Sequence, residues 1–146
     1  MSENKKYKTQ KQTALQCSVG LLARREHSEY ELRQKLNQRE FPIDEIELAI
    51  ERLLDKDYLS DTRFAHSTCR YRVNRGYGWR YIANELKQKG VCSTIIQQLN
   101  NNCEIDWYLQ AELAYNKRFG NGSGKDSPST HKEQAKKIRF LQYRGF

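Results

Sequence analysis

Apolar residues recur at every third or fourth position along most of this chain, the spacing that places side chains on one face of an α-helix. No segment shows the sustained alternation of apolar and polar residues that predicts a β-strand. The sequence therefore predicts an all-α protein. The sets expected to face a core are, in chain order, Leu15, Val19 and Leu22; Leu32 and Leu36; Ile46, Ile50, Leu53 and Leu54; Phe64, Thr68 and Tyr71; Trp79, Ile82, Ala83 and Leu86; Ile95, Ile96 and Leu99; Trp107, Ala111 and Ala114; and Ala135, Ile138 and Leu141.

Residues that begin and end helices flank these apolar sets. A Ser, Thr or Asp followed three residues later by Glu or Gln predicts a capping box, in which each side chain bonds the other residue's backbone N–H. Gly90 suits the position just after a helix, where glycine easily takes a positive φ. The expected boxes are Thr13 with Gln16, Ser28 with Glu31, Asp44 with Glu47 and Thr130 with Glu133, and single N-caps are expected at Ser93 and Asp106.

One short motif occurs three times. Each copy has a leucine, two polar or aromatic residues, a cation, a small or polar residue and an apolar residue. The copies are Leu36–Phe41, Leu86–Val91 and Leu141–Phe146, and their leucines are 50 and 55 residues apart. Self-similarity at a nearly constant period predicts one supersecondary unit used repeatedly, and such units stack into an elongated array.

The apolar sets, the caps and the motif together predict a tandem array of three-helix repeats. Residues 13–58 form the first repeat and residues 59–104 the second. Residues 105–146 form an incomplete third repeat, with two helices and no last helix before the chain ends. Residues 1–12 are polar and lysine-bearing, and this composition predicts a disordered basic tail.

Charge changes this picture because its sign differs along the chain. The net charge is +8, from 26 basic and 18 acidic residues. Residues 24–61 carry a net charge of −4, whereas residues 62–90 and residues 115–146 each carry +6. An excess of basic residues favours an anionic partner, either nucleic acid or an acidic protein groove. The uneven placement indicates a partner bound in one orientation.

Two groups of basic residues are candidates for contacting this partner. One precedes Tyr77 within a few residues, and the other lies on one face of the last predicted helix, opposite its apolar stripe. Arginine can bind phosphate or carboxylate with two parallel hydrogen bonds, and a neighbouring ring can stack or anchor. Trp79, close by, is expected in the core. The predicted partner-binding residues are Arg70, Arg72, Arg75, Tyr77, Lys132, Lys136, Arg139 and Arg144.

Residues suited to catalysis or metal binding are scarce. The three histidines lie far apart, and the four cysteines, Cys17, Cys69, Cys92 and Cys103, form no CxxC pair. Segment 120–124 is rich in glycine but lacks the preceding strand and the Gly-Lys-Ser/Thr ending of a phosphate loop. No segment approaches the ~18 apolar residues of a transmembrane helix. We therefore expect a cytoplasmic protein with reduced thiols that is not an enzyme and has no cofactor or metal.

A succession of short motifs extends over about residues 14–146. They are His27-Ser28-Glu29, Glu31-Leu32-Arg33, Lys35-Leu36, Tyr58-Leu59, Asp61, Arg63-Phe64, Arg75-Gly76-Tyr77-Gly78, Ile82, Glu85-Leu86, Gln88-Lys89-Gly90, Ile105-Asp106-Trp107, Arg139-Phe140-Leu141 and Tyr143-Arg144-Gly145-Phe146. Each motif is short, but in this order and at this spacing they resemble the RecX family, regulators of the RecA recombinase.

The resemblance implies three tandem three-helix repeats and no catalysis. It also implies binding in the helical groove of the RecA filament on single-stranded DNA, which inhibits the recombinase, ATPase and co-protease activities of RecA. The expected protein is then a monomer that acts in DNA recombination, DNA repair and the SOS response. Family members usually continue past the last motif into another helix, whereas this chain ends at Phe146.

A second hypothesis is an autonomous nucleic-acid-binding protein, because three-helix units with basic second helices can resemble helix-turn-helix readers. That hypothesis requires Asn or Gln residues crowded on a recognition helix, and it favours a symmetric dimer. The asymmetric charge of this chain favours an oriented partner instead. Binding to the RecA filament is therefore the main expectation, and direct binding to DNA is the alternative.

Overall fold

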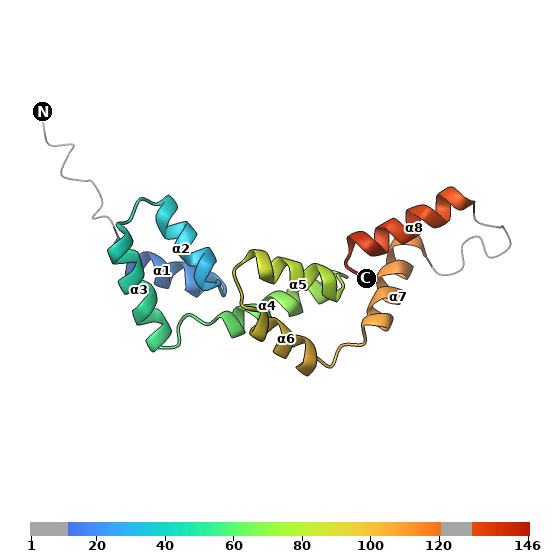
Figure 1. Cartoon of the computed structure of the whole chain (residues 1–146). Coiled ribbons are helices and arrows are strands. Elements are labelled where there is room, and N and C mark those ends of the chain that lie inside the picture. The colour runs from blue at the N-terminus through green and yellow to red at the C-terminus, as the bar shows by residue number, and fades with distance from the viewer. Residues whose placement is uncertain (1–11, 121–129) are drawn as a thin grey trace, which may run out of the picture. The chain divides into compact units, whose positions relative to one another are not determined.

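The computed structural model describes residues 12–120 and 130–146, and every regular element in these ranges is an α-helix (Figure 1). The all-α prediction is therefore confirmed for these residues. The predicted tail, residues 1–12, and the glycine-rich segment 120–124 lie outside the described residues except at Gln12 and Gly120. The helices are α1 (Ala14–Arg24), α2 (Glu29–Gln38), α3 (Ile43–Asp55), α4 (Asp61–Asn74), α5 (Trp79–Gln88), α6 (Ser93–Asn102), α7 (Trp107–Phe119) and α8 (His131–Tyr143).

The chain forms two compact units, Met1–Asp61 and Thr62–Phe146. The first unit holds α1, α2 and α3, and α3 packs against both of its partners. The second unit holds a further three helices, α4 to α6, followed by the pair α7 and α8. The expected succession of three-helix groups is present. The separation of residues 59–104 from residues 105–146 as distinct repeats stays a prediction.

The buried face of α1 in the first unit is shifted from the predicted one: Leu15 and Leu22 pack, partly buried, against the core as predicted, but Val19 does not. Val19 is 49% exposed, whereas Ala14, Cys17 and Leu21 are buried. These three residues follow helical spacing, and the small side chains of Ala14 and Cys17 let the neighbouring helices approach closely. The prediction for Leu54 is also wrong, because its side chain is exposed. The core of the unit consists of Ala14, Cys17, Leu21, Leu32, Leu36, Ile46, Ala49, Ile50, Leu53 and Leu59.

The second unit has its own core around α4, α5 and α6. Trp79 is half-buried against this core, as expected, with its ring centroid 5.9 Å from that of Trp107. Tyr71 is exposed, so the prediction that it faces the core is wrong. Ala65 and Cys69 of α4 occupy the buried face instead. The buried core residues are Phe64, Ala65, Cys69, Ile82, Leu86, Val91 and Leu99.

The helix starts agree with the predicted caps at four of six sites. Both reciprocal bonds of the box are present at Thr13 and at Thr130, and the side chains of Ser28 and Asp106 accept from the backbone N–H three residues on. No side-chain bond caps α3 or α6. The predicted box at Asp44 is wrong because α3 begins at Ile43, directly after Pro42, so that Asp44 is already helical. The predicted cap at Ser93 is wrong because that residue is already helical.

The threefold motif of the sequence ends a helix in each case. The last residue of each copy donates its N–H to the carbonyl of the motif leucine, five residues earlier, and the residue before it has a positive φ. This is the Schellman arrangement of a helix C-terminus. The bonds join Phe41 to Leu36 over 3.4 Å, Val91 to Leu86 over 3.0 Å and Phe146 to Leu141 over 3.0 Å, and the positive-φ residues are Glu40, Gly90 and Gly145.

The motif leucines are not equally buried. Leu36 and Leu86 are fully buried, whereas Leu141 is only half-buried. The expectation of equivalent buried positions is therefore wrong for Leu141. In the first two groups a third helix follows the motif and covers the leucine, but within the described residues α8 packs mainly on α7.

Backbone hydrogen bonds join the third copy of the motif, at the end of α8, to the turn between α4 and α5. The N–H of Gly78 donates to the carbonyl of Arg144 over 2.6 Å, and the N–H of Arg80 donates to that of Gly145 over 3.1 Å. A Cβ atom on Gly145 would collide with the backbone nitrogen of Tyr81. Glycine is therefore needed for this backbone-to-backbone approach.

Helix α8 contacts α7 through residues that the apolar pattern did not select. Ile138, predicted to face inward, is 56% exposed. Phe140 instead meets Phe119 edge to face, with ring centroids 5.3 Å apart. The ammonium of Lys137 lies 5.6 Å from the ring centroid of Tyr115. The aromatic rings of α7 therefore pack with Phe140 and Lys137 of α8 rather than with Ile138.

Candidate partner-binding surface

An ion pair holds the first predicted arginine group in place. Arg72 of α4 donates from Nε and Nη2 to the two carboxylate oxygens of Glu85 on α5, over 2.7 and 3.1 Å. The two side chains are only 24% and 21% exposed. The bond to Glu85 raises the pKa of the Arg72 guanidinium. Bidentate pairs of this kind are geometrically specific, so Arg72 links α4 to α5.

Tyrosine rings surround this ion pair. The Arg72 guanidinium carbon lies 5.3 Å from the ring centroids of both Tyr77 and Tyr81, and 5.4 Å from that of Tyr71. The Tyr77 and Tyr81 rings are themselves 4.2 Å apart. Partial burial raises the pKa of the Tyr81 hydroxyl. The rings fix the orientation of the guanidinium through cation–π contacts.

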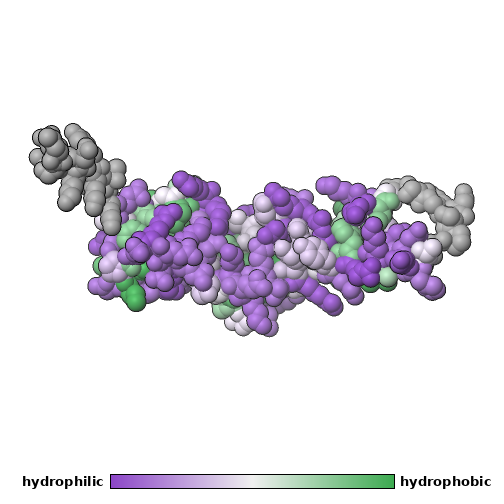
Figure 2. Space-filling model, turned by 90° about the horizontal axis from the view of Figure 1, so that it is seen from above, coloured by the Kyte–Doolittle hydropathy of each residue, from purple (hydrophilic) through white to green (hydrophobic). Residues whose placement is uncertain are grey.

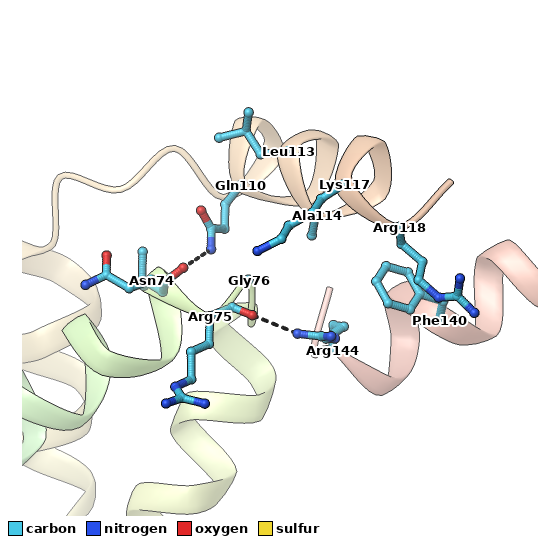
Figure 3. Close-up of a pocket in the computed structure, with 11 residues that line it drawn as sticks. Asn74, Arg75, Gly76, Gln110, Leu113, Ala114, Lys117, Arg118, Phe140 and Arg144 are labelled. Atoms are coloured by element: carbon cyan, nitrogen blue, oxygen red, sulfur yellow. Dashed lines mark hydrogen bonds between the residues drawn. The ribbon is translucent and has the colours of Figure 1, made fainter. Parts of the chain in front are cut away.

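Arg75 and Arg144 join the same group although they come from distant parts of the chain. The guanidinium of the exposed Arg75 lies 4.4 Å from the Tyr71 ring centroid. That of Arg144 lies 4.7 Å from the Tyr77 ring, and its Nη1 donates to the backbone carbonyl of Arg75 over 2.7 Å (Figure 3). We call this group the arginine–tyrosine cluster; its members are Tyr71, Arg72, Arg75, Tyr77, Tyr81 and Arg144.

The other predicted residues lie outside this cluster. Arg70 is exposed on α4. Lys132, Lys136 and Arg139 are all exposed on one side of α8, as the sequence pattern predicts, and form a second basic face. The surface of the molecule seen in Figure 2 is correspondingly hydrophilic over most of its area, with small, separate hydrophobic areas.

A cavity of about 420 Å³ opens beside the cluster, between α4, α7 and α8 (Figure 3). The amide of Gln110 donates to the carbonyl of Val73 over 2.6 Å on one side of it, and Arg144 bonds Arg75 on the other. Lys117 and Arg118 line the cavity together with Leu113 and Phe140, and no acidic side chain lines it. The cavity is therefore cationic along one part of its wall and apolar along another.

Lys117 and Arg118 are not among the partner-binding residues predicted from the sequence. They lie in the last turn of α7, where basic residues interact favourably with the helix dipole, and this is their ordinary structural interpretation. The signal that could have identified them is a pair of adjacent cations directly before an aromatic residue, Phe119. The sequence could not show that α7 would bring them beside the turn that carries Arg75.

A buried polar group in the first unit contains the imidazole of His27, which is 1% exposed. Its Nε2 lies 2.9 Å from the ammonium of Lys35, and its Nδ1 lies 3.0 Å from the carbonyl oxygen of Arg25. Lysine can only donate, so Nε2 accepts and Nδ1 carries the proton. Burial lowers the pKa of His27, which is neutral in this arrangement. The group is a packed structural element.

Candidate metal ligands are not clustered in the described part of the chain. No cluster of three or more His, Cys, Asp or Glu residues there could hold a metal ion. Burial raises the pKa of the Cys69 thiol to about 11, which disfavours the nucleophilic thiolate. None of the described helices is both long and apolar enough to span a membrane. What the surface offers is charge, hydrogen-bond donors and aromatic rings.

Known proteins are similar to this chain in sequence and in fold. The family models for the first and second three-helix domains of RecX match residues 14–53 and 60–99. The regulatory protein RecX of Vibrio campbellii is 43% identical over 131 residues, 90% of this chain and 82% of the relative. That of Pseudomonas entomophila is 40% identical over 129 residues, 88% of this chain and 81% of the relative.

The fold comparison agrees with the sequence comparison. The crystal structure of RecX from Lactobacillus salivarius superposes with a TM-score of 0.71 at 23% identity, covering 91% of this chain and 86% of that one. The successive three-helix groups, the matched family models and the extent of the sequence identity lead to one conclusion. This chain belongs to the RecX family of regulatory proteins.

Proposed function

We propose that this protein binds the RecA filament on single-stranded DNA and inhibits its recombinase, ATPase and co-protease activities. Membership of the RecX family supports a regulatory role. In this proposal the protein acts as a monomer in the cytoplasm, in DNA recombination, DNA repair and the SOS response. It works by occupying a surface of the filament and catalyses no reaction itself.

The observation that carries the proposal is the placement of charge around the arginine–tyrosine cluster. Residues 62–146 contain 15 basic and 6 acidic residues, whereas residues 1–61 contain 11 basic and 12 acidic. A filament on DNA presents phosphates together with protein carboxylates, and both form strong charge-assisted hydrogen bonds with arginine. The second unit is thus the better candidate for the contact.

Within that unit, exposure separates residues that contact the partner from residues that position them. Arg70 and Arg75 are exposed and can reach a partner. Arg72 is engaged with Glu85, so its role is to position the exposed arginines of α4. Tyr77 and Arg144 hold the backbone and side chains around Arg75 in the same way. The exposed face of α8, with Lys132, Lys136 and Arg139, is a second candidate contact.

One observation favours the alternative of direct DNA reading by a helix-turn-helix-like unit. Helix α6 exposes Gln97, Gln98 and Asn101, and amide side chains read adenine in the major groove. The same helix carries no Lys or Arg, although phosphate contacts supply most of the affinity of DNA-binding proteins. Filament binding through the basic surfaces is therefore the function that we propose.

The test measures the DNA-dependent ATP hydrolysis of RecA in the presence of this protein. In the variant Arg70→Glu/Arg75→Glu, we expect the concentration giving half-inhibition to rise about tenfold or more, because attraction becomes repulsion at two contacts. The matched control is Arg24→Glu/Arg52→Glu, which makes the same charge change on exposed arginines of the first unit. Circular dichroism checks that both variants retain their helices.

Two results would argue against the assignment. Equal inhibition by the folded Arg70→Glu/Arg75→Glu variant and the wild type would remove α4 from the contact. The α8 variant Lys132→Glu/Lys136→Glu/Arg139→Glu then decides whether the second basic face makes it. If both variants inhibit like the wild type, the basic surfaces of the second unit do not bind the filament.

A further inference from the structure

We propose that the cavity between α4, α7 and α8 binds one nucleotide unit of single-stranded DNA. Its phosphate lies against Lys117 and Arg118, and its base lies against the apolar wall formed by Leu113 and Phe140. This inference rests on the proposed function, because it names the contact that a filament-bound protein makes with the DNA strand at this place.

The side chains that line the cavity are basic or uncharged. Lys117 extends from α7 into the space beside Gly76, and Arg118 follows it at the α8 side (Figure 3). The Arg144 guanidinium lines the same space. None of the lining residues is acidic, so these cations have no counter-charge within the cavity. An anionic group entering it is attracted by all three.

The walls of the cavity are already fixed. The Gln110 amide donates to the carbonyl of Val73, and Arg144 donates to the carbonyl of Arg75. These carbonyls lie at the C-terminal end of α4, the end that carries partial negative charge. Because side-chain donors cover them, the end of α4 repels an anion less than a bare helix terminus does. A ligand therefore meets a preformed, cationic site with little reorganisation.

The apolar wall distinguishes a nucleotide from a carboxylate side chain. Leu113 of α7 and Phe140 of α8 add apolar surface to the cationic lining, and the cavity volume is about 420 Å³. Ligand sites of roughly 300–1,000 Å³ hold molecules of nucleotide size. An Asp or Glu side chain is short and has no flat apolar group to place against that wall. A phosphate joined to a base matches both parts.

Two exposed tyrosines adjoin residues that line the cavity, Arg75 and Arg144, and suit the neighbouring nucleotides of a single strand. Tyr143, on the last turn of α8, is 71% exposed, and Tyr71 is exposed beneath the Arg75 guanidinium. Single-strand binders combine a cationic groove with aromatic rings on which successive bases stack. Double-stranded DNA keeps its bases paired and offers no free base to the wall or to these rings. The expected strand is therefore single.

The experiment measures binding of a fluorescein-labelled 15-nucleotide oligothymidylate by anisotropy, without RecA, at several salt concentrations. We expect the full-length variant Lys117→Gln/Arg118→Gln to bind about tenfold or more weakly. The slope of log affinity against log salt should fall in magnitude by about 0.7, since the single phosphate that Lys117 and Arg118 share contributes about 0.7 on a single strand. The matched control is Arg52→Gln/Lys56→Gln, an exposed Arg and Lys of the first unit.

A second probe tests the apolar wall. The wild type should bind oligothymidylate more tightly than an abasic strand of the same length, and Leu113→Ala should reduce that preference. Equal losses in the cavity variant and the control would overturn the site, because they would show general electrostatic attraction. So would a cavity variant that loses affinity for a polyglutamate peptide while it keeps its affinity for the oligonucleotide.

The oligonucleotide-binding experiment and the RecA-inhibition experiment can succeed or fail independently. If the cavity variant loses oligonucleotide affinity while the wild type fails to inhibit RecA, the cavity assignment stands and the proposed function falls. If the cavity variant keeps its oligonucleotide affinity and salt slope, the cavity assignment is wrong, whatever the inhibition assay shows.

Discussion

Gly78 and Gly145 meet backbone to backbone: a Cβ atom on Gly78 would lie 2.6 Å from the carbonyl oxygen of Gly145. Gly78 directly follows the segment Arg75-Gly76-Tyr77 at the α4–α5 turn, and Gly145 lies within the similar segment Arg144-Gly145-Phe146 at the end of α8. Their approach carries Arg144 to Arg75 and Tyr77, and so completes the arginine–tyrosine cluster. The close approach of α8 to the α4–α5 turn thus requires glycine, which has no Cβ atom, at both positions.

Gly145→Ala should destabilise the second unit by about 2–4 kcal/mol, because it combines a left-handed backbone with a steric collision. The φ of Gly145 is +91°, and its Cβ would meet the backbone of Tyr81. Urea denaturation followed by tryptophan fluorescence measures this, since both tryptophans, Trp79 and Trp107, lie in this unit. Unchanged stability would show that α8 docks elsewhere.

The matched control is Gly20→Ala in α1, where a Cβ atom would meet nothing within 4 Å. Alanine is favoured over glycine in a helix interior, so this variant should be about 0.5–1 kcal/mol more stable than the wild type. Thermal denaturation followed by circular dichroism checks it. A loss of stability here would show that glycine replacement is harmful for a reason other than packing at the helix end.

The motif leucines should respond to truncation according to their burial. Leu86→Ala should destabilise the second unit by about 2–5 kcal/mol, because Leu86 is fully buried. Leu141→Ala should cost about half as much or less, because the side chain of Leu141 is half-buried. Tryptophan fluorescence in urea measures both variants. Equal losses would mean that Leu141 is covered as completely as Leu86.

Glu40→Gly should stabilise the first unit by up to about 1 kcal/mol. A residue other than glycine in the left-handed conformation costs about 1–2 kcal/mol, and the larger backbone entropy that glycine loses on folding offsets part of this gain. Glu40 has a φ of 64° at the position held by Gly90 and Gly145 in the other two copies of the motif. Gly90→Ala makes the opposite change and should destabilise. Circular dichroism in urea compares the two.

The helical fold was predictable because it depends on local signals. Thr13 and Thr130 cap their helices through neighbours three residues away, and Gly90 ends α5 through its own backbone. The motif that repeats with Leu36 and Leu86 proved to be a helix C-terminus, which again requires only six consecutive residues. Interactions between residues so close along the chain can be predicted from the sequence.

The site was only partly predictable because its contacts join distant segments. The sequence identified Arg72, Arg75 and Arg144 as candidates, but it could not show that Glu85 engages Arg72 or that Arg144 bonds the backbone of Arg75. Periodicity also selected Ile138 as inward, whereas the aromatic residues of α7 pack with Phe140. Which face of a helix is buried depends on its neighbours, and the sequence does not name them.

Arg72→Gln and Arg75→Gln should separate a structural arginine from a contact arginine. Arg72→Gln leaves the Glu85 carboxylate without its bidentate partner and should cost about 1 kcal/mol, a value reduced by the partial exposure of the pair. Arg75→Gln should change the free energy of unfolding by less than about 0.5 kcal/mol. Urea denaturation compares them. Equal effects would contradict the division of roles within the cluster.

The first unit should lose stability as the pH falls through the range below 6.5. Burial lowers the pKa of His27 from its ordinary value of 6.5, and the positive charges of Arg25 and Lys35 lower it further, against the opposing effect of Glu31. The unfolded chain then binds a proton at a pH where the folded chain does not, so the free energy of unfolding rises with pH in this range, by at most about 1.4 kcal/mol per pH unit for one proton. The stability contributed by neutral His27 is fully present above pH 6.5 and declines below it.

The measurement is urea denaturation followed by circular dichroism between pH 5 and 8. His27→Gln should flatten the dependence below pH 6.5, because glutamine keeps polar groups near Lys35 and Arg25 but does not titrate. The control His66→Gln replaces an exposed histidine of α4 and should keep the slope of the wild type. If His27→Gln keeps the pH dependence of the wild type, another group causes this dependence. The contact between His27 and Lys35 then does not lower the pKa of the imidazole.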